Sequence, residues 1–185
     1  MNSKDIVNIS LFATLLSVCA WICIPTTVPF TMQTFAVFLA MLVLGGKRGT
    51  IVITIYLILG IIGIPVFSRG TAGIGILFGN TGGYMFGWIF IGIIMIQAER
   101  IADKYSGKKA QYRKWIQTAG MLLGLVVCYL FGTIWFMNVY TNNLEEMGIQ
   151  AVLGMCVLPF VIPDLIKMAL AFAVCKRIRK IVVNV

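Results

Sequence analysis

Two charged side chains stand three residues apart inside one of the most apolar segments of the sequence. Asp164 and Lys167 lie in the stretch FVIPDLIKMALAF, at residues 160–172. At this spacing they share one face of a helix and can form an ion pair. A charge at mid-membrane costs about 2.5–3.5 kcal/mol, so both must face the interior of the protein. There they either only neutralise each other or also bind a polar ligand.

Two prolines near the charged pair favour a ligand. Pro159 and Pro163 lack the N–H group that a helix interior needs, so Asp164 is expected at a helix start or break. Backbone groups freed at such a break need partners, which a substrate could supply. Proton or ion coupling is an alternative, because buried acids can change protonation during transport. The presence of only one acid within the predicted spans argues against it.

Enzymatic chemistry lacks the residues that it needs. The sequence contains no histidine, which removes the commonest general base and metal ligand. Without a GxSxG motif or a second membrane-embedded acid, neither a serine triad nor an aspartyl dyad can form. The five cysteines are scattered through apolar runs, which indicates packing rather than disulfides or metal binding. We therefore expect no enzyme, no metal and no cofactor, and an intramembrane hydrolase remains a third hypothesis.

The composition indicates the elements that must position the charged pair. The chain is 60% hydrophobic and 11% charged, with a mean hydropathy of +0.98, whereas a soluble domain carries about a quarter charged residues. With 185 residues, the chain has room for about five to seven spans of about 20 residues each. We predict an all-α membrane protein in which residues 1–185 form a single integral membrane domain.

Six apolar segments can be marked between clusters of glycine, proline and charge. The first is expected to be a retained span, because no small-x-small cleavage pattern follows it. The second and third are short for full spans, so we expect helices that are tilted, broken or extended into the flanking loops. The segments cover residues 6–24, 35–44, 50–64, 84–98, 116–140 and 152–175.

Basic residues predict the orientation of a six-helix bundle with both termini cytoplasmic. Lys and Arg near span ends are retained on the cytoplasmic side. With six spans, thirteen of the fifteen fall inside, and only Arg69 and Lys167 do not. The thirteen are Lys4, Lys47, Arg48, Arg100, Lys104, Lys108, Lys109, Arg113, Lys114, Lys176, Arg177, Arg179 and Lys180.

The loops predicted to lie outside have a different character from the basic inner ones. Residues 26–34 and 67–83 are rich in Gly, Thr and Pro yet still apolar. Such a composition suits backbone folded over a cavity, so the outer end is the expected working end. Two pairs of glycines four residues apart, Gly83 with Gly87 and Gly120 with Gly124, are expected to let helices pack closely.

Four motifs together resemble the BioY family, the biotin-capturing S components of energy-coupling-factor (ECF) transporters. They are IPTTVPFTMQT at residues 24–34, LGIIGIPVF at 59–67, GNTGGYMFGW at 79–88 and PFVIPDLIK at 159–167. The resemblance covers nearly the whole chain in the same order. It implies a six-helix protein of a prokaryotic cell membrane that binds biotin near its outer face. Delivery inward would require a transmembrane coupling subunit and two ATPase subunits.

The resemblance also implies which residues bind the ligand and the partner. Asp164 and Lys167 match the polar pair of the last helix, and Ala13 with Ser17 is the nearest match to the contact with the coupling subunit. The other matching positions are Asn80 and Tyr84 in the TGGY region and Gln33 and Thr34 in the capping first loop.

The chemistry of biotin is compatible with these residues. Asp164 could accept from a ureido N–H, Asn80 could donate to the ureido carbonyl, and Lys167 could hold Asp164 ionised or donate to the ligand directly. Arg69, the only cation in the outer loops, could attract the carboxylate. Aromatic side chains expected to wall the ring are Tyr84, Phe78 and Trp135. A carrier for another small vitamin, such as thiamine or riboflavin, is the alternative, because loops rather than fold select the ligand.

Overall fold

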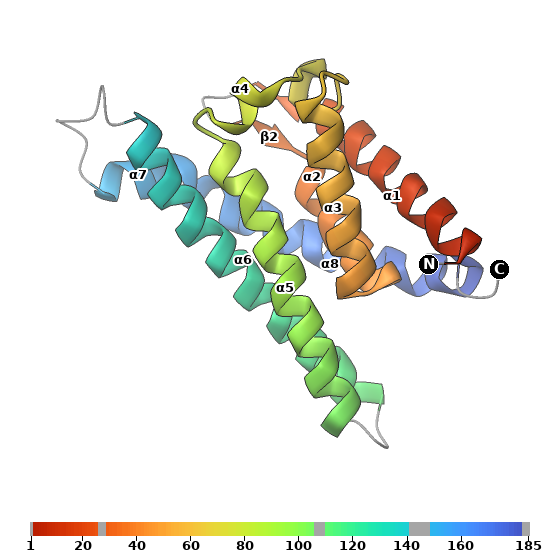
Figure 1. The fold of residues 1–185 in the computed structure, drawn as a ribbon. Coiled ribbons are helices and arrows are strands. Elements are labelled where there is room, and N and C mark those ends of the chain that lie inside the picture. The colour runs from red at the N-terminus through yellow and green to blue at the C-terminus, as the bar shows by residue number, and fades with distance from the viewer. Residues whose placement is uncertain (1, 26–28, 106–109, 141–148, 183–185) are drawn as a thin grey trace.

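The computed structural model describes residues 2–25, 29–105, 110–140 and 149–182, and within them the fold is helical (Figure 1). This confirms the all-α prediction. Residues 26–28 of the first outer loop and 106–109 of an inner one lie outside the described residues. The elements are α1 (Ser3–Trp21), β1 (Cys23–Ile24), β2 (Phe30–Thr31), α2 (Gln33–Leu44), α3 (Gly46–Ile61), the 3-10 turn η1 (Ser68–Gly70), α4 (Ile74–Leu77), α5 (Gly82–Tyr105), α6 (Ala110–Tyr140), α7 (Ile149–Cys156) and α8 (Leu158–Val182).

Among the described helices, four stretches are long and apolar enough to cross a membrane. They are Ser3–Trp21, Gly82–Tyr105, Tyr112–Val139 and Val152–Ile178. The short helix α2 packs against α1, α3 and α8, and its residues 36–44 are all buried. Because protein rather than lipid surrounds α2, its twelve residues need not cover the full hydrocarbon thickness of about 30 Å.

Helix α3 begins earlier than the apolar pattern suggests. It starts at Gly46 rather than at residue 50. The helix therefore extends into the flanking basic turn, which is one of the three alternatives predicted for this short segment. The backbone N–H of Gly46 donates to Glu99 Oε2 at 2.9 Å. A helix start leaves backbone donors without partners inside the helix, and the carboxylate from α5 supplies one.

The sixth apolar segment contains two helices instead of one. Helix α7 ends at Cys156 and α8 begins at Leu158. Pro159 is the second residue of α8. In the first turn of a helix the backbone N–H groups have no acceptor within the helix, so the missing N–H of a proline costs no helical hydrogen bond there. The break therefore precedes Pro159. Asp164 lies in the second turn of α8, directly after Pro163 within the helix, so the prediction that it sits at a helix start or break is wrong.

Glycines hold α5 and α6 close together. A Cβ atom at Gly87 would lie 2.6 Å from Cys128 Sγ, and one at Gly124 would lie 3.0 Å from the Cα of Ile91. These separations are too short for any larger side chain without movement of the backbone. The prediction that these glycines serve helix packing is confirmed. Because α5 and α6 lie this close together, Tyr84 on α5 and Tyr129 on α6 belong to the same wall of the candidate site described below.

Irregular segments gather at one end of the molecule. Figure 1 shows β2, η1 and α4 together, away from the N-terminal end of α1 and the C-terminal end of α8. Trp21, the last residue of α1, donates from Nε1 to the carbonyl oxygen of Pro65 at 3.1 Å. Arg69 within η1 has a φ of 59°, a left-handed conformation that few non-glycine residues adopt. This end carries the candidate site.

Candidate ligand-binding site

A pocket with a polar corner lies among the irregular segments and helices α2, α5, α6, α7 and α8. Its empty space, with the open mouth included, amounts to about 740 Å³. Its lining comes from the first loop and α2 (Pro29, Thr31, Gln33, Thr34), the segments between α3 and α5 (Phe67, Ser68, Ile76, Thr81), α5 (Tyr84, Met85, Trp88), α6 (Leu125, Cys128, Tyr129), α7 (Cys156) and α8 (Phe160, Asp164, Lys167).

The carboxylate of Asp164 is the centre of the polar corner. Asp164 is only 2% exposed, and three groups from three helices donate to it. Thr34 Oγ1 on α2 donates to Oδ1 at 2.8 Å, and Lys167 Nζ donates to the same oxygen at 2.9 Å. Tyr129 on α6 donates from its hydroxyl to Oδ2 at 2.7 Å. The buried charge is therefore paired and hydrogen-bonded, as burial demands.

Lys167 is also committed to groups of the protein. It is 5% exposed and donates to Thr34 Oγ1 at 3.1 Å in addition to Asp164. Its Nζ lies 4.2 Å from the ring centroid of Phe30 on β2. An ammonium group has three N–H donors, and here a carboxylate, a hydroxyl and an aromatic face meet them. In this structure Lys167 supports Asp164 rather than reaching into open space.

Gln33 forms a second polar group on the pocket wall. Its Nε2 donates to the Tyr56 hydroxyl at 2.6 Å, and its Oε1 accepts from Thr31 Oγ1 at 2.7 Å. Tyr56 is fully buried, with ring centroids 5.5 Å from Phe67 and 6.3 Å from Trp88. Because its two partners are themselves held by packing, the amide of Gln33 has a defined orientation.

The structure brings together five of the seven predicted ligand-binding residues. Gln33, Thr34, Tyr84, Asp164 and Lys167 all line the pocket. Tyr84 is half-buried, with its hydroxyl 3.3 Å from Thr133 Oγ1.

Asn80 and Arg69 are placed differently. Neither is among the described residues that line the pocket. Asn80 is half-buried in the turn before α5, and Arg69 is exposed in η1, although the preceding residues Phe67 and Ser68 do line the pocket.

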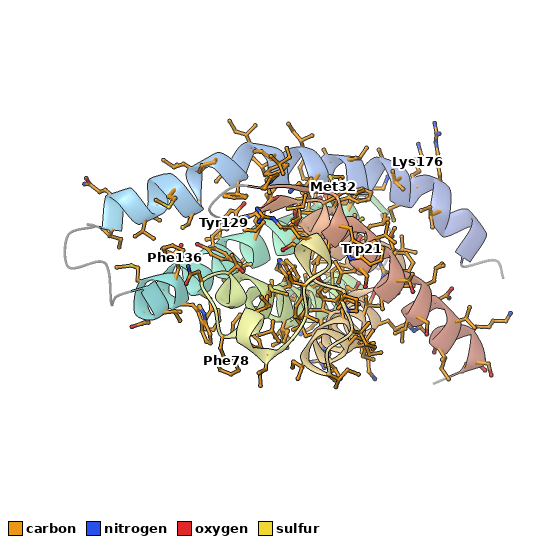
Figure 2. The ribbon with its side chains drawn as sticks, turned by 90° about the horizontal axis from the view of Figure 1, so that it is seen from above. Trp21, Met32, Phe78, Tyr129, Phe136 and Lys176 are labelled. Carbon is orange, nitrogen blue, oxygen red and sulfur yellow. The ribbon has the colours of Figure 1, made fainter. Side chains whose placement is uncertain are left out.

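Two of the three aromatic side chains expected to wall the ligand lie elsewhere. Phe78 is 59% exposed, and Figure 2 shows it pointing away from the interior side chains. Its ring centroid lies 6.0 Å from that of Trp135, whose Nε1 donates to the carbonyl oxygen of Gly79 at 3.1 Å. The prediction that Phe78 and Trp135 wall the pocket is wrong, and Trp88 lines the pocket beside Tyr84.

The sequence alone did not reveal Tyr129 and Thr31, which line the pocket, or Tyr56, which accepts from Gln33. Tyr129 lies among the interior side chains in Figure 2. One signal was present in the sequence, since a phenol within the apolar run 116–140 must place its hydroxyl near a polar partner. No comparable signal indicated which partner this would be.

The two residues expected to contact a coupling subunit face inward. Ala13 is 3% exposed and Ser17 is 8% exposed. Ser17 Oγ donates to the carbonyl oxygen of Ala13 at 3.0 Å. Helix α1 packs this face against α2 and α3, whereas Leu11 and Val18 on its other face are exposed. A residue covered by its own chain offers no surface to a partner, so Ala13 and Ser17 do not form an outward contact here.

Comparison with known proteins finds relatives along the whole chain. The model of the BioY family matches residues 1–184. The biotin transporter BioY of Thermotoga maritima is 35% identical over 186 residues, which cover 98% of this chain and 99% of that protein. The probable biotin transporter BioY of Pyrococcus horikoshii is 37% identical over 180 residues, covering 97% and 98% of the two chains.

Solved structures show a related fold. The crystal structure of the S-component for biotin from an ECF-type ABC transporter matches with a TM-score of 0.78 at 25% identity, over 97% of this chain and 95% of that one. The S component of a bacterial ECF transporter matches with a TM-score of 0.61 at 16% identity, over 98% of each chain, which shows likeness of fold alone. Since the family model and the two named relatives each match almost from end to end, this chain belongs to the BioY family.

Proposed function

We propose that this multi-pass membrane protein is the S component of an ATP-driven ECF transporter and that it captures biotin in the pocket around Asp164. The observation that carries the proposal is the buried, hydrogen-bonded pair of Asp164 and Lys167 lining a pocket in a chain whose relatives are named biotin transporters. The family consists of transporters, so the chain is not an enzyme and the hydrolase hypothesis is set aside.

The pocket suits a neutral head group with hydrogen-bonding capacity. The acid and the base compensate each other, so the corner favours a ligand part without net charge, such as a cyclic urea. A ureido N–H would donate to Asp164, and Gln33 with Thr34 would complete the polar wall. Met85, Trp88 and Leu125 would pack on the thioether ring and the alkyl chain. We keep Asn80 as the donor to the ureido carbonyl and Arg69 as the attractor of the carboxylate.

The direct test is ligand binding by the purified protein. In detergent, calorimetry is expected to show biotin binding with a Kd in the micromolar range or below, which corresponds to a binding free energy of about −8 kcal/mol or a more negative value. Thiamine and riboflavin, the vitamins of the alternative, are expected not to compete. Competition by either one at the strength of biotin would contradict the proposal. Biotin methyl ester serves as a control for Arg69, because it lacks the carboxylate that this arginine would attract.

Transport is proposed to require a transmembrane coupling subunit and two ATPase subunits. The S-component whose crystal structure resembles this chain belongs to an ECF-type ABC transporter. The GGKRGT stretch at residues 45–50 of this chain lacks the spacing of a phosphate-binding loop, which supports ATP hydrolysis by separate subunits. Vesicles containing this chain alone are therefore expected to bind biotin without ATP-driven uptake.

We further propose that residues 1–185 form one membrane domain with six spans and both termini in the cytoplasm. The spans would be α1, α2, α3, α5, α6 and the α7–α8 pair. One buried apolar cluster joins residues from α1, α2, α3, α5, α6 and α8, which supports a single domain. The positions of the basic residues support the orientation. Figure 1 shows the start of α1 and the end of α8 away from β2 and α4, as two cytoplasmic termini would require.

Cysteine labelling tests this orientation. In a chain whose five native cysteines are replaced by alanine, Thr71→Cys is expected to react with a membrane-impermeant maleimide on intact cells. Ser3→Cys is expected to react only after lysis. Both positions are exposed in the structure, so accessibility within the protein is matched. Labelling of Ser3→Cys on intact cells would contradict a cytoplasmic amino terminus.

A further inference from the structure

The hydrogen bonds of Asp164 leave little of its carboxylate open to a ligand. A carboxylate offers about four lone-pair positions. Thr34 and Lys167 occupy two of them on Oδ1, at 2.8 and 2.9 Å. Tyr129 occupies one on Oδ2 at 2.7 Å. One acceptor position, on Oδ2, remains for a ligand, and the hydroxyl of Tyr129 is directly beside it.

We propose that Tyr129 is a specificity-determining residue that limits Asp164 to a single N–H donor from the ligand and thereby selects a cyclic urea over a cyclic guanidine. This inference rests on the proposed function, because it concerns the same pocket. It assigns a role to Tyr129 on α6. The Asp164–Lys167 pair is already neutral without this residue.

The two ligand classes differ in donors and in charge. Biotin carries a urea, whereas 2-iminobiotin has the same bicyclic frame with a guanidine that is protonated at neutral pH. Two N–H groups on adjacent nitrogens of a guanidinium can both donate to one carboxylate oxygen, which has two lone pairs. In the wild-type pocket Tyr129 blocks the second position. The guanidinium would also bring a second positive charge near Lys167 Nζ, which lies 2.9 Å from Asp164 Oδ1.

Removing the hydroxyl should affect the two ligands differently. In the empty pocket of a Tyr129→Phe variant, water can take the freed acceptor position on Oδ2. Bound biotin would expel that water and leave the acceptor without a partner, which costs free energy. 2-Iminobiotin carries the additional donor that can fill the position. The substitution keeps the ring and its packing, so it isolates the hydrogen bond.

The experiment measures the affinities of biotin and 2-iminobiotin for three proteins at one pH. Wild type is expected to bind 2-iminobiotin at least tenfold more weakly than biotin. Tyr129→Phe is expected to bind biotin roughly tenfold more weakly than wild type, the size of one lost bond to a charged group, while 2-iminobiotin changes less than threefold. Tyr84→Phe is the matched control from the same pocket. Its hydroxyl faces Thr133 rather than Asp164, so the affinities for the two ligands should change by the same factor.

Each result separates the inference from the function on which it rests. If Tyr129→Phe weakens both ligands equally, or neither, Tyr129 is not a selector although the protein still captures biotin. Equal affinity of wild type for the two ligands overturns the inference whether or not the variant folds. Failure of wild type to bind biotin overturns the proposed function itself.

Discussion

Replacing Asp164 by asparagine is expected to weaken biotin binding by about 2 kcal/mol or more, a factor of roughly 30. Asparagine has nearly the same shape but presents an NH₂ group in place of one carboxylate oxygen. It therefore cannot accept from Thr34, Lys167 and Tyr129 at once, as the carboxylate does. Lys167 would be left as a buried charge without its counter-ion. Calorimetric titration of the purified variant measures the loss.

A double-mutant cycle shows whether the pair acts as a unit. Lys167→Met alone is expected to cost a similar amount, because it leaves the carboxylate uncompensated. The double variant Asp164→Asn/Lys167→Met should lose less than the sum of the single losses, since no unpaired charge remains. Asp103→Asn is the matched control. Its ion pair with Arg113, at 3.0 Å, is exposed and contributes at most about 1 kcal/mol to stability. Binding by both single variants at the parental strength would show that the site is elsewhere.

Replacing Gly87 by valine is expected to separate α5 from α6 and to destabilise the protein by about 1–3 kcal/mol or more. The new Cβ would lie 2.6 Å from Cys128 Sγ and 3.1 Å from Cys128 Cα, so the backbone of α6 must move. Cys128 and Tyr129 both line the pocket. The displacement should therefore weaken biotin binding as well. Thermal unfolding in detergent, monitored as the loss of monodisperse protein with rising temperature, measures the destabilisation.

Gly154→Val is the matched control for this packing argument. Gly154 also lies in a helix, yet a Cβ there meets no atom within 4 Å. The two substitutions share the same change in backbone entropy and β-branching, so their difference reports the contact between α5 and α6. Equal melting temperatures for the two variants would mean that the close approach of these helices is not required for stability.

Local features of the sequence were sufficient to predict the helical class and the charged pair. Long apolar runs leave helices as the way to satisfy backbone groups in lipid, and a spacing of three residues places Asp164 and Lys167 on one face whatever else surrounds them. The glycines four apart likewise predicted close helix packing from their size alone. These properties depend on residues near one another in the chain.

Only the tertiary structure decided which distant side chains meet. Thr34 and Asp164 are 130 residues apart, and their contact depends on how α2 and α8 are rotated against each other. Similar rotations turn Ala13 and Ser17 inward, expose Phe78 and bring Tyr129 to Asp164. In a chain that is 60% hydrophobic, lipid-facing and buried helix faces have nearly the same composition. The apolar pattern therefore cannot specify these rotations, and packing around small residues and polar contacts determines them.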